Sequence, residues 1–302
     1  MERSLGDSWN HARFDATSSR IQQQLAGGQL REALEGAQSL LQRAQAAGGQ
    51  AYPGADYDLA GACFLLARVL KTVGGSEQAL PLLVDARQRF EIVAKQRPDS
   101  GAERMASACI TERGACLLSL GRLDEAALAY EEVIRSGEQL RNEREYAVAK
   151  GNLATVRLLQ GRYSEALTDH KETNKLYTNL GEPGSVAIAY HQTGFVYEKA
   201  GQPEAAEGAY RKSLQLEVRL GNVAGQARTL GQLGNLYKNA LHRLEDAAGF
   251  YRQAAEKFVE GRDVAREGST RSNLADTLRR LRRLDEARQE IRRAIECKAE
   301  FG

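Results

Sequence analysis

Residues 194–210 read GFVYEKAGQPEAAEGAY, and the spacing within this stretch decides the fold. Small residues, Gly194 and Ala206, are each followed by an aromatic residue, Tyr197 and Tyr210. The middle of the stretch recurs as a six-residue pattern that starts with glycine and ends with alanine. Clear copies are GRLDEA at 121–126, GRYSEA at 161–166 and GQPEAA at 201–206.

The final alanine of this pattern returns at a nearly constant interval. With four more divergent copies the series is Ala33, Ala79, Ala126, Ala166, Ala206, Ala247 and Ala287, so the spacings are 46, 47, 40, 40, 41 and 40 residues. A fixed period of this length indicates stacked repeats in which each repeat is one supersecondary unit. Because one repeat cannot bury its own apolar face, its neighbours complete the core.

Each copy lies between two stretches with the apolar spacing of amphipathic helices. Before the copy that ends at Ala247, the apolar residues are Leu230, Leu233 and Tyr237. In the copy at 201–206, the second apolar stripe begins at Ala206 and continues with Tyr210. Glycine between the stretches suits the left-handed residue that ends a helix, since it lacks Cβ. The predicted helix pairs are 10–27 with 29–46, 57–73 with 76–95, 101–120 with 123–138, 143–160 with 163–179, 184–200 with 203–219, 223–240 with 244–259, and 263–280 with 284–299.

Two sets of turns follow from the glycines. A second series, Gly181, Gly221 and Gly261, predicts the turns between successive repeats. The turn KNALHRL at 238–244 has one residue more than the equivalent turns and lacks their glycine. The extra residue is compatible with a bulge or with a neutral insertion.

The composition agrees with an all-α fold and excludes several function classes. Proline occurs 5 times in 302 residues, and strand-forming segments are few. The net charge is +2, from 42 basic and 40 acidic residues, which gives no general attraction to nucleic acid or to an anionic membrane. The polar N-terminus is unlike a signal peptide, and no apolar run is long enough to span a bilayer. We therefore expect a soluble, cytoplasmic protein.

The sequence contains no recognisable catalytic or cofactor motif. The four histidines are scattered, no phosphate-binding glycine loop follows a strand, and the four cysteines form no CxxC pair. We expect the cysteines to be small buried side chains, and we expect no enzyme activity, cofactor or metal.

The repeat resembles the tetratricopeptide repeat in its longer form of about forty residues, as in LGN-like and kinesin-light-chain-like arrays. Its small residue in the first helix is matched by Gly114, Ala154, Gly194, Gly234 and Ala275. The aromatic three residues later is matched by Tyr197 and Tyr237 but replaced by Arg157, and the aromatic of the second helix is replaced by His170 in the same repeat. The resemblance implies that these aromatics are core residues and that the fold is a right-handed superhelix of about seven helix pairs.

In this family the first helix of each repeat (helix A) lines a concave groove that binds peptides. The resemblance therefore implies a set of inward-facing polar residues for binding a peptide or protein segment. They are Asn152, Thr155, His191, Gln192, Glu198, Arg228, Gln232, Asn235, Lys238, Asn273, Asp276, Arg279 and Arg280. Asparagine and glutamine offer a donor and an acceptor to a peptide backbone, and arginine and lysine bind carboxylates.

We expect one array over residues 1–302, with two divergent repeats in 1–100 and five regular ones in 101–302. The basic run 279–293 contains interleaved acids, which favours surface pairing over nucleic-acid binding. Gly302 falls at a repeat boundary, and Ile291, Ile295 and Phe301 suggest an apolar face that needs cover. We expect either that the chain is part of a longer protein or that this face serves self-association. The main functional hypothesis is a non-enzymatic binding scaffold. The alternatives are a regulatory arm of a larger enzyme or signalling effector and, more weakly, a peptide-sensing transcriptional regulator.

Overall fold

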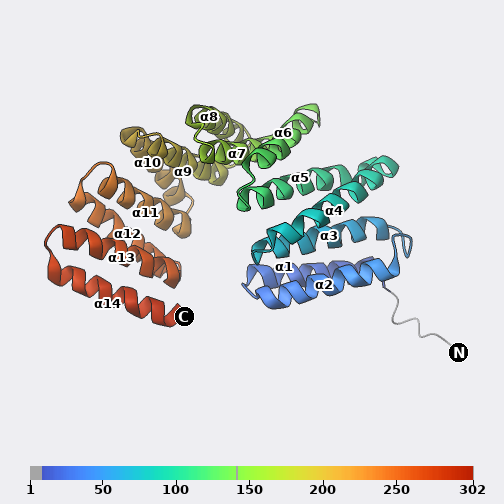
Figure 1. The fold of residues 1–302 in the computed structure, drawn as a ribbon, viewed down its shortest axis with the longest axis horizontal. Coiled ribbons are helices and arrows are strands. Elements are labelled where there is room, and N and C mark those ends of the chain that lie inside the picture. The colour runs from blue at the N-terminus through green and yellow to red at the C-terminus, as the bar shows by residue number, and fades with distance from the viewer. Residues whose placement is uncertain (1–8, 141, 302) are drawn as a thin grey trace. The chain divides into compact units, whose positions relative to one another are not determined.

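The computed structural model describes residues 9–140 and 142–301, with the backbone alone at 137–140, 300 and 301. Fourteen α-helices and one 3₁₀ turn occur in this part of the chain, and no strand does (Figure 1). The helices are α1 (His11–Ala26), α2 (Leu30–Ala47), α3 (Ala55–Thr72), α4 (Ser76–Gln96), α5 (Ala102–Ser119), α6 (Leu123–Leu140), α7 (Glu143–Leu159), α8 (Tyr163–Asn179), α9 (Pro183–Lys199), α10 (Pro203–Arg219), α11 (Val223–Asn239), α12 (Leu244–Glu260), α13 (Val264–Arg280) and α14 (Leu284–Phe301), with the 3₁₀ turn at Pro98–Ser100.

The predicted helix pairs are confirmed, with every boundary within two residues of its expected place. The fold class is therefore all-α and consists of seven helix pairs. Helices with odd numbers are the A helices and those with even numbers the B helices. The apolar spacing and the turn glycines are strong enough here that tertiary contacts do not move the helix ends.

The small residue in each A helix lets the aromatic of the B helix approach closely, as the repeat pattern predicts. A Cβ added to Gly194 would lie 2.7 Å from the ring of Tyr210, and one added to Gly234 would lie 2.6 Å from the ring of Tyr251. Both tyrosines are fully buried. Since these distances are shorter than real Cβ contacts, glycine is required for the observed crossing of the two helices.

The turns inside the repeats follow the glycine prediction in most copies. Gly161 and Gly201 have φ of 76° and 71°, the left-handed conformation that ends a helix. Where the glycine is missing, another residue takes this conformation: His242 (φ 56°) and Arg282 (φ 64°). The turn with the extra residue does bulge, because the Arg243 amide donates to the Tyr237 carbonyl six residues earlier, whereas the equivalent bond from Gln202 to Tyr197 spans five residues.

One predicted turn glycine is not used as expected. Gly181 and Gly221 are left-handed (φ 67° and 64°), but Gly261 has φ −81°. The next residue, Arg262, takes the left-handed conformation instead (φ 55°). The reason is that α12 continues through Glu260, so that Gly261 still has helical angles and the reversal falls one residue later.

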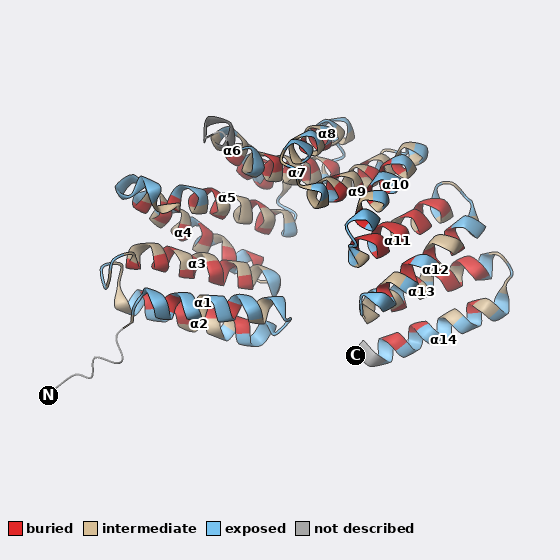
Figure 2. Ribbon diagram, turned by 180° about the vertical axis from the view of Figure 1, so that it is seen from behind, coloured by how far each residue is buried: buried red, intermediate tan, exposed pale blue. Residues whose placement is uncertain are grey.

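The chain forms two compact units, divided within α7 between Val156 and Arg157. In the first unit, the largest core cluster joins α1 to α5 and includes Phe14, Leu40 and Phe90. In the second unit, a cluster through α10 to α14 is built on the buried tyrosines Tyr210, Tyr237 and Tyr251. Figure 2 shows buried residues along the inner helices of each unit, whereas α14 is largely exposed. The single array over 1–302 stays a prediction.

The fourth repeat replaces both family aromatics by polar residues and compensates for one of them. Arg157, in the place of the first aromatic, donates through Nη1 to Asp169 Oδ2 at 2.5 Å, and the side chains are only 18% and 3% exposed. His170, in the place of the second, is buried, and within the described residues neither ring nitrogen has a hydrogen-bond partner. Burial lowers its pKa to about 4, so the ring is neutral near pH 7.

Candidate functional site

The predicted binding residues lie on A helices, in two separate units. Asn152 and Thr155 are on α7 in the first unit, where the Thr155 hydroxyl donates to the Gly151 carbonyl at 3.2 Å. The others belong to the second unit, on α9, α11 and α13. We call the set on these three helices the A-helix strip: Gln192, Glu198, Arg228, Gln232, Asn235, Lys238, Asn273, Asp276, Arg279 and Arg280.

Three amides occupy equivalent positions on successive A helices of the strip. Gln192, Gln232 and Asn273 each lie two residues before the small residue of the repeat and are half-buried. The side-chain oxygen of Gln232 (Oε1) accepts a hydrogen bond from the side-chain amide of Asn235 (Nδ2) at 3.1 Å. The side-chain NH₂ group of Gln232 therefore remains a donor. A row of amides at matched positions is suited to binding peptide backbone groups.

Two strip residues also support the fold, because they satisfy the hydroxyls of buried tyrosines. The Tyr210 hydroxyl donates to Glu198 Oε2 at 3.0 Å, and the Tyr251 hydroxyl donates to Asn235 Oδ1 at 2.7 Å. Burial, with Glu198 nearby, raises the pKa of Tyr210, so its hydroxyl stays a donor. These bonds hold Glu198 and Asn235 in fixed orientations at the surface.

The charged residues of the strip are partly paired. Asp276 accepts from Arg279 at 2.9 Å and lies 3.6 Å from the Lys238 ammonium group. The hydrogen bond from Arg279, with the positive charges of Lys238 and Arg280, lowers the pKa of Asp276. Arg228 and Arg280 are exposed and have no ion pair within the described residues. The strip thus has two arginines that are available to a carboxylate.

His191 is a core residue, and we leave it out of the binding set. It is 7% exposed, its Nδ1 lies 3.0 Å from the Thr229 hydroxyl, and its ring packs against Tyr210 with centroids 5.4 Å apart. Burial, with the positive charge of Arg228, lowers its pKa to about 4. The ring is thus neutral near pH 7 and is not presented at the surface.

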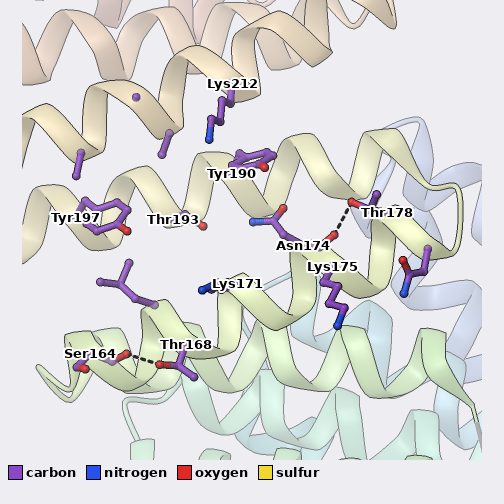
Figure 3. Close-up of a pocket in the computed structure, with 15 residues that line it drawn as sticks. Ser164, Thr168, Lys171, Asn174, Lys175, Thr178, Tyr190, Thr193, Tyr197 and Lys212 are labelled. Carbon is purple, nitrogen blue, oxygen red and sulfur yellow. Dashed lines mark hydrogen bonds between the residues drawn. The ribbon is translucent and has the colours of Figure 1, made fainter.

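A second surface feature of this unit was not predicted from the sequence. An open cleft of about 820 Å³ lies between the B helices α8 and α10, with α9 contributing tyrosines (Figure 3). We call it the basic cleft. Its polar lining consists of Ser164, Thr168, Lys171, Asn174, Lys175, Thr178, Tyr190, Thr193, Tyr197 and Lys212, with Asn179 at one end. The expectation that the tyrosines are core holds for Tyr210, Tyr237 and Tyr251. Tyr197 packs against the core but, with Tyr190, also lines this cleft.

The cleft has the electrostatic character of an anion-binding surface. Three lysines and no carboxylate line it. All three lysines are exposed, and within residues 9–140 and 142–301 none of them has an ion pair. The Lys212 ammonium group lies 5.4 Å from the centre of the Tyr190 ring. The signal in the sequence was the absence of Asp or Glu four residues before or after each of these lysines.

The basic run and the apolar residues at the C-terminal end are the remaining surface features that the sequence predicts. The basic run 279–293 pairs with neighbouring acids, as in Arg283 with Glu286 at 2.6 Å and Arg288 with Asp285 at 3.2 Å, so the expected surface pairing is confirmed. Ile295 is 60% exposed on α14. Gly302 and the side chain of Phe301 lie outside the described residues, and self-association stays a prediction.

The described residues contain no cluster of three or more metal-ligating side chains. The four cysteines are buried, as expected, and burial raises the pKa of Cys63 and of Cys109 to about 12. Among the helices that the structure describes, none is long and apolar enough to cross a membrane.

The geometry described above defines a class, the helical repeat proteins built from stacked helix pairs. The tetratricopeptide repeat family matches residues 145–217 and 185–258, and a second tetratricopeptide repeat family matches residues 268–302. Residues 145–258 and 268–302 are therefore tetratricopeptide repeats, and an earlier repeat shows the same close packing between Gly114 and Tyr130. None of the curated proteins matches its sequence significantly.

Solved structures with the same fold share little sequence with this chain. BtubC (BKLC) from P. vanneervenii is 19% identical, with a TM-score of 0.66 over 75% of this chain and 92% of that one. A signal transduction ATPase with a tetratricopeptide repeat sensor, from Pyrococcus horikoshii, is 14% identical, with a TM-score of 0.66 over 97% of this chain and 48% of that chain. The Rap conjugation gene regulator of plasmid pLS20, in complex with the Phr* peptide, is 14% identical, with a TM-score of 0.61 over 99% of this chain and 80% of that chain.

Proposed function

We propose that this chain is a non-enzymatic, cytoplasmic scaffold that binds a peptide or protein segment along the A-helix strip. The observation that carries the proposal is the row of equivalent amides, Gln192, Gln232 and Asn273, on three successive A helices. An extended segment that crosses these helices meets a backbone-binding amide on each of them. The exposed Arg228 and Arg280 favour a segment with a carboxylate.

Two further observations support this proposal. Glu198 and Asn235 are held by buried tyrosine hydroxyls, so part of the strip is ordered before a ligand binds, which lowers the entropic cost of binding. The Rap regulator with the same fold was solved with a peptide bound. That likeness concerns the fold, and it makes a peptide a reasonable first ligand class to test.

The test uses peptides selected from a random library on the purified chain. We expect the triple variant Gln192→Ala/Gln232→Ala/Asn273→Ala to bind the selected peptides roughly tenfold or more weakly, because each lost hydrogen bond contributes about 0.5–1.5 kcal/mol. The matched control removes three exposed glutamines from B helices, Gln215→Ala/Gln253→Ala/Gln289→Ala. Circular dichroism checks that both variants fold. Equal affinities of wild type and strip variant for every selected peptide would show that the strip is not the binding surface.

A second function rests on the likeness to the ATPase from Pyrococcus horikoshii. This chain covers 48% of the length of that protein. On this alternative, the chain is the sensor arm of a larger enzyme or signalling effector. The gene sequence around the coding region of residues 1–302 tests it. The alternative requires a catalytic domain in the same reading frame.

A further inference from the structure

We propose that the basic cleft is a second binding site, separate from the A-helix strip, and that it binds an extended, carboxylate-rich segment of another protein. The cleft lies on the side of α8 and α10, the B helices of two successive repeats. On α9, the cleft residues Tyr190, Thr193 and Tyr197 are spaced i, i+3 and i+7, which places them on one face of the helix. Gln192 of the strip is about 100–160° away from them around the same helix.

The shape of the cleft suits an extended chain rather than a small anion. Along α8 the lining runs from Ser164 to Thr178 at alternating spacings of four and three residues, a straight stripe about 21 Å long. A segment of roughly six or seven extended residues has this length. The opposite wall is open because α10 presents Ala205, Gly208 and Ala209, and a Cβ added to Gly208 would meet nothing within 4 Å.

The charges of the cleft select an anionic segment. Lys171 and Lys175 lie one turn apart on α8, and Lys212 extends from α10 toward Tyr190 (Figure 3). Their positive charges have no carboxylate partner within the described residues and face a common cleft, so an acidic ligand is attracted without breaking existing ion pairs. A ligand whose carboxylates recur along an extended backbone meets all three lysines.

One polar atom in the cleft is buried without a partner. Asn174 Oδ1 has almost no solvent exposure and no hydrogen bond within the described residues, and the side chain points toward the space beside Tyr190 (Figure 3). Such an acceptor is costly to leave unpaired. A turn of the Asn174 side-chain amide would bring this acceptor to a backbone amide of a bound segment, a donor that a carboxylate or an inorganic anion alone does not supply. This favours a peptide.

The surroundings of the cleft argue against a nucleic acid. Nucleic-acid grooves combine a continuous track of positive charge with free aromatic faces. Here the positive track is short, because Glu165 follows Ser164 at one end and Glu204 precedes Ala205 on the other wall. One face of the Tyr190 ring is already covered by the Lys212 ammonium group.

The test measures binding of a fluorescein-labelled ten-residue peptide of alternating aspartate and serine, by anisotropy at low salt. The same peptide with asparagine in place of aspartate is the neutral control. We expect the aspartate peptide to bind and the asparagine peptide to bind roughly tenfold or more weakly. We expect the variant Lys171→Gln/Lys175→Gln/Lys212→Gln to bind the aspartate peptide more weakly than wild type by the same factor. The charge-matched control variant, Lys95→Gln/Lys199→Gln/Lys298→Gln, removes three exposed lysines outside the cleft and should change the affinity less than about threefold.

A second variant tests the shape of the cleft with every lysine retained. Gly208→Leu places a side chain in the open wall, where the helix tolerates it, and we expect it to weaken binding roughly tenfold. The strip variant Gln192→Ala/Gln232→Ala/Asn273→Ala should bind the aspartate peptide like wild type, which separates this site from the one proposed above. Equal losses in the two lysine variants, or an unchanged affinity in Gly208→Leu, would overturn the proposal. So would a single-stranded oligothymidylate that binds more tightly than the peptide and depends on the same lysines.

Discussion

Two buried histidines make the stability of the C-terminal unit depend on pH between about 6.5 and about 4. His170 and His191 are 2% and 7% exposed, and burial lowers the pKa of each from 6.5 to about 4. In the unfolded chain both rings are hydrated and take up a proton near pH 6.5. Between the two values the unfolded state therefore binds more protons than the folded state. The contribution to stability is complete above pH 6.5 and is lost as the pH falls toward 4.

The size of the effect follows from the two pKa values. Each histidine loses roughly 3 kcal/mol once the pH is below both values, because a tenfold change in proton affinity corresponds to about 1.4 kcal/mol. Between pH 7.5 and pH 5 the loss is about 2 kcal/mol for one histidine and about 4 kcal/mol for both. Most carboxylates stay ionised over this range, so the histidines dominate the change.

Urea unfolding at pH 7.5 and pH 5, followed by circular dichroism, measures this loss. In His170→Leu the leucine has a similar volume and cannot take up a proton. The variant should lose about 2 kcal/mol less than wild type between the two pH values. It should also be no less stable at pH 7.5, because neither ring nitrogen of His170 has a partner within the described residues. His242→Gln, at an exposed turn, is the matched control and should behave like wild type. If His170→Leu loses as much stability as wild type, His170 is not a buried neutral histidine and the reasoning fails.

Further predictions concern packing and a buried ion pair. Gly194→Ala places a methyl group 2.7 Å from the Tyr210 ring and should lower the free energy of unfolding by about 1–3 kcal/mol in thermal or urea denaturation, and an unchanged value would contradict the close crossing. Gly249→Ala, in α12 with nothing within 4 Å, is its control and should instead raise stability by about 0.5–1 kcal/mol. Asp169→Asn removes the carboxylate 2.5 Å from Arg157 and should cost about 3 kcal/mol in urea unfolding, whereas a cost below about 1 kcal/mol would mean that the pair is not desolvated.

The helices were predictable because two independent signals agree at each boundary. The turn glycine and the apolar stripe place the end of α9 and the start of α10 within one residue of the expected positions. The Gly194–Tyr210 contact was predictable as well, since only a missing side chain admits an aromatic ring at that crossing. The left-handed Arg262 was not predictable, because which residue of a turn reverses the chain depends on how far α12 continues.

The surfaces were harder to predict than the core. The place of His191 in the repeat predicts a groove residue, yet its ring is buried, with Nδ1 3.0 Å from the Thr229 hydroxyl of the next A helix. The basic cleft was missed because its residues come from α8, α9 and α10 and look ordinary in each helix alone. The sequence shows that each of the three lysines lacks an acidic residue four positions away, but that all three face one cleft follows only from the packing of the helices.

The left-handed residues that are not glycine give a practical route to a more stable protein. His242, Arg262 and Arg282 all lie in the last two repeats, and an L-residue in this conformation costs on the order of 1 kcal/mol relative to glycine. Each is an exposed turn residue. Substituting glycine at each of the three positions therefore offers a consensus-style stabilisation that leaves both proposed binding surfaces untouched. In this stabilised protein, the variants of the A-helix strip and of the basic cleft would stay folded more readily in selection and crystallisation experiments.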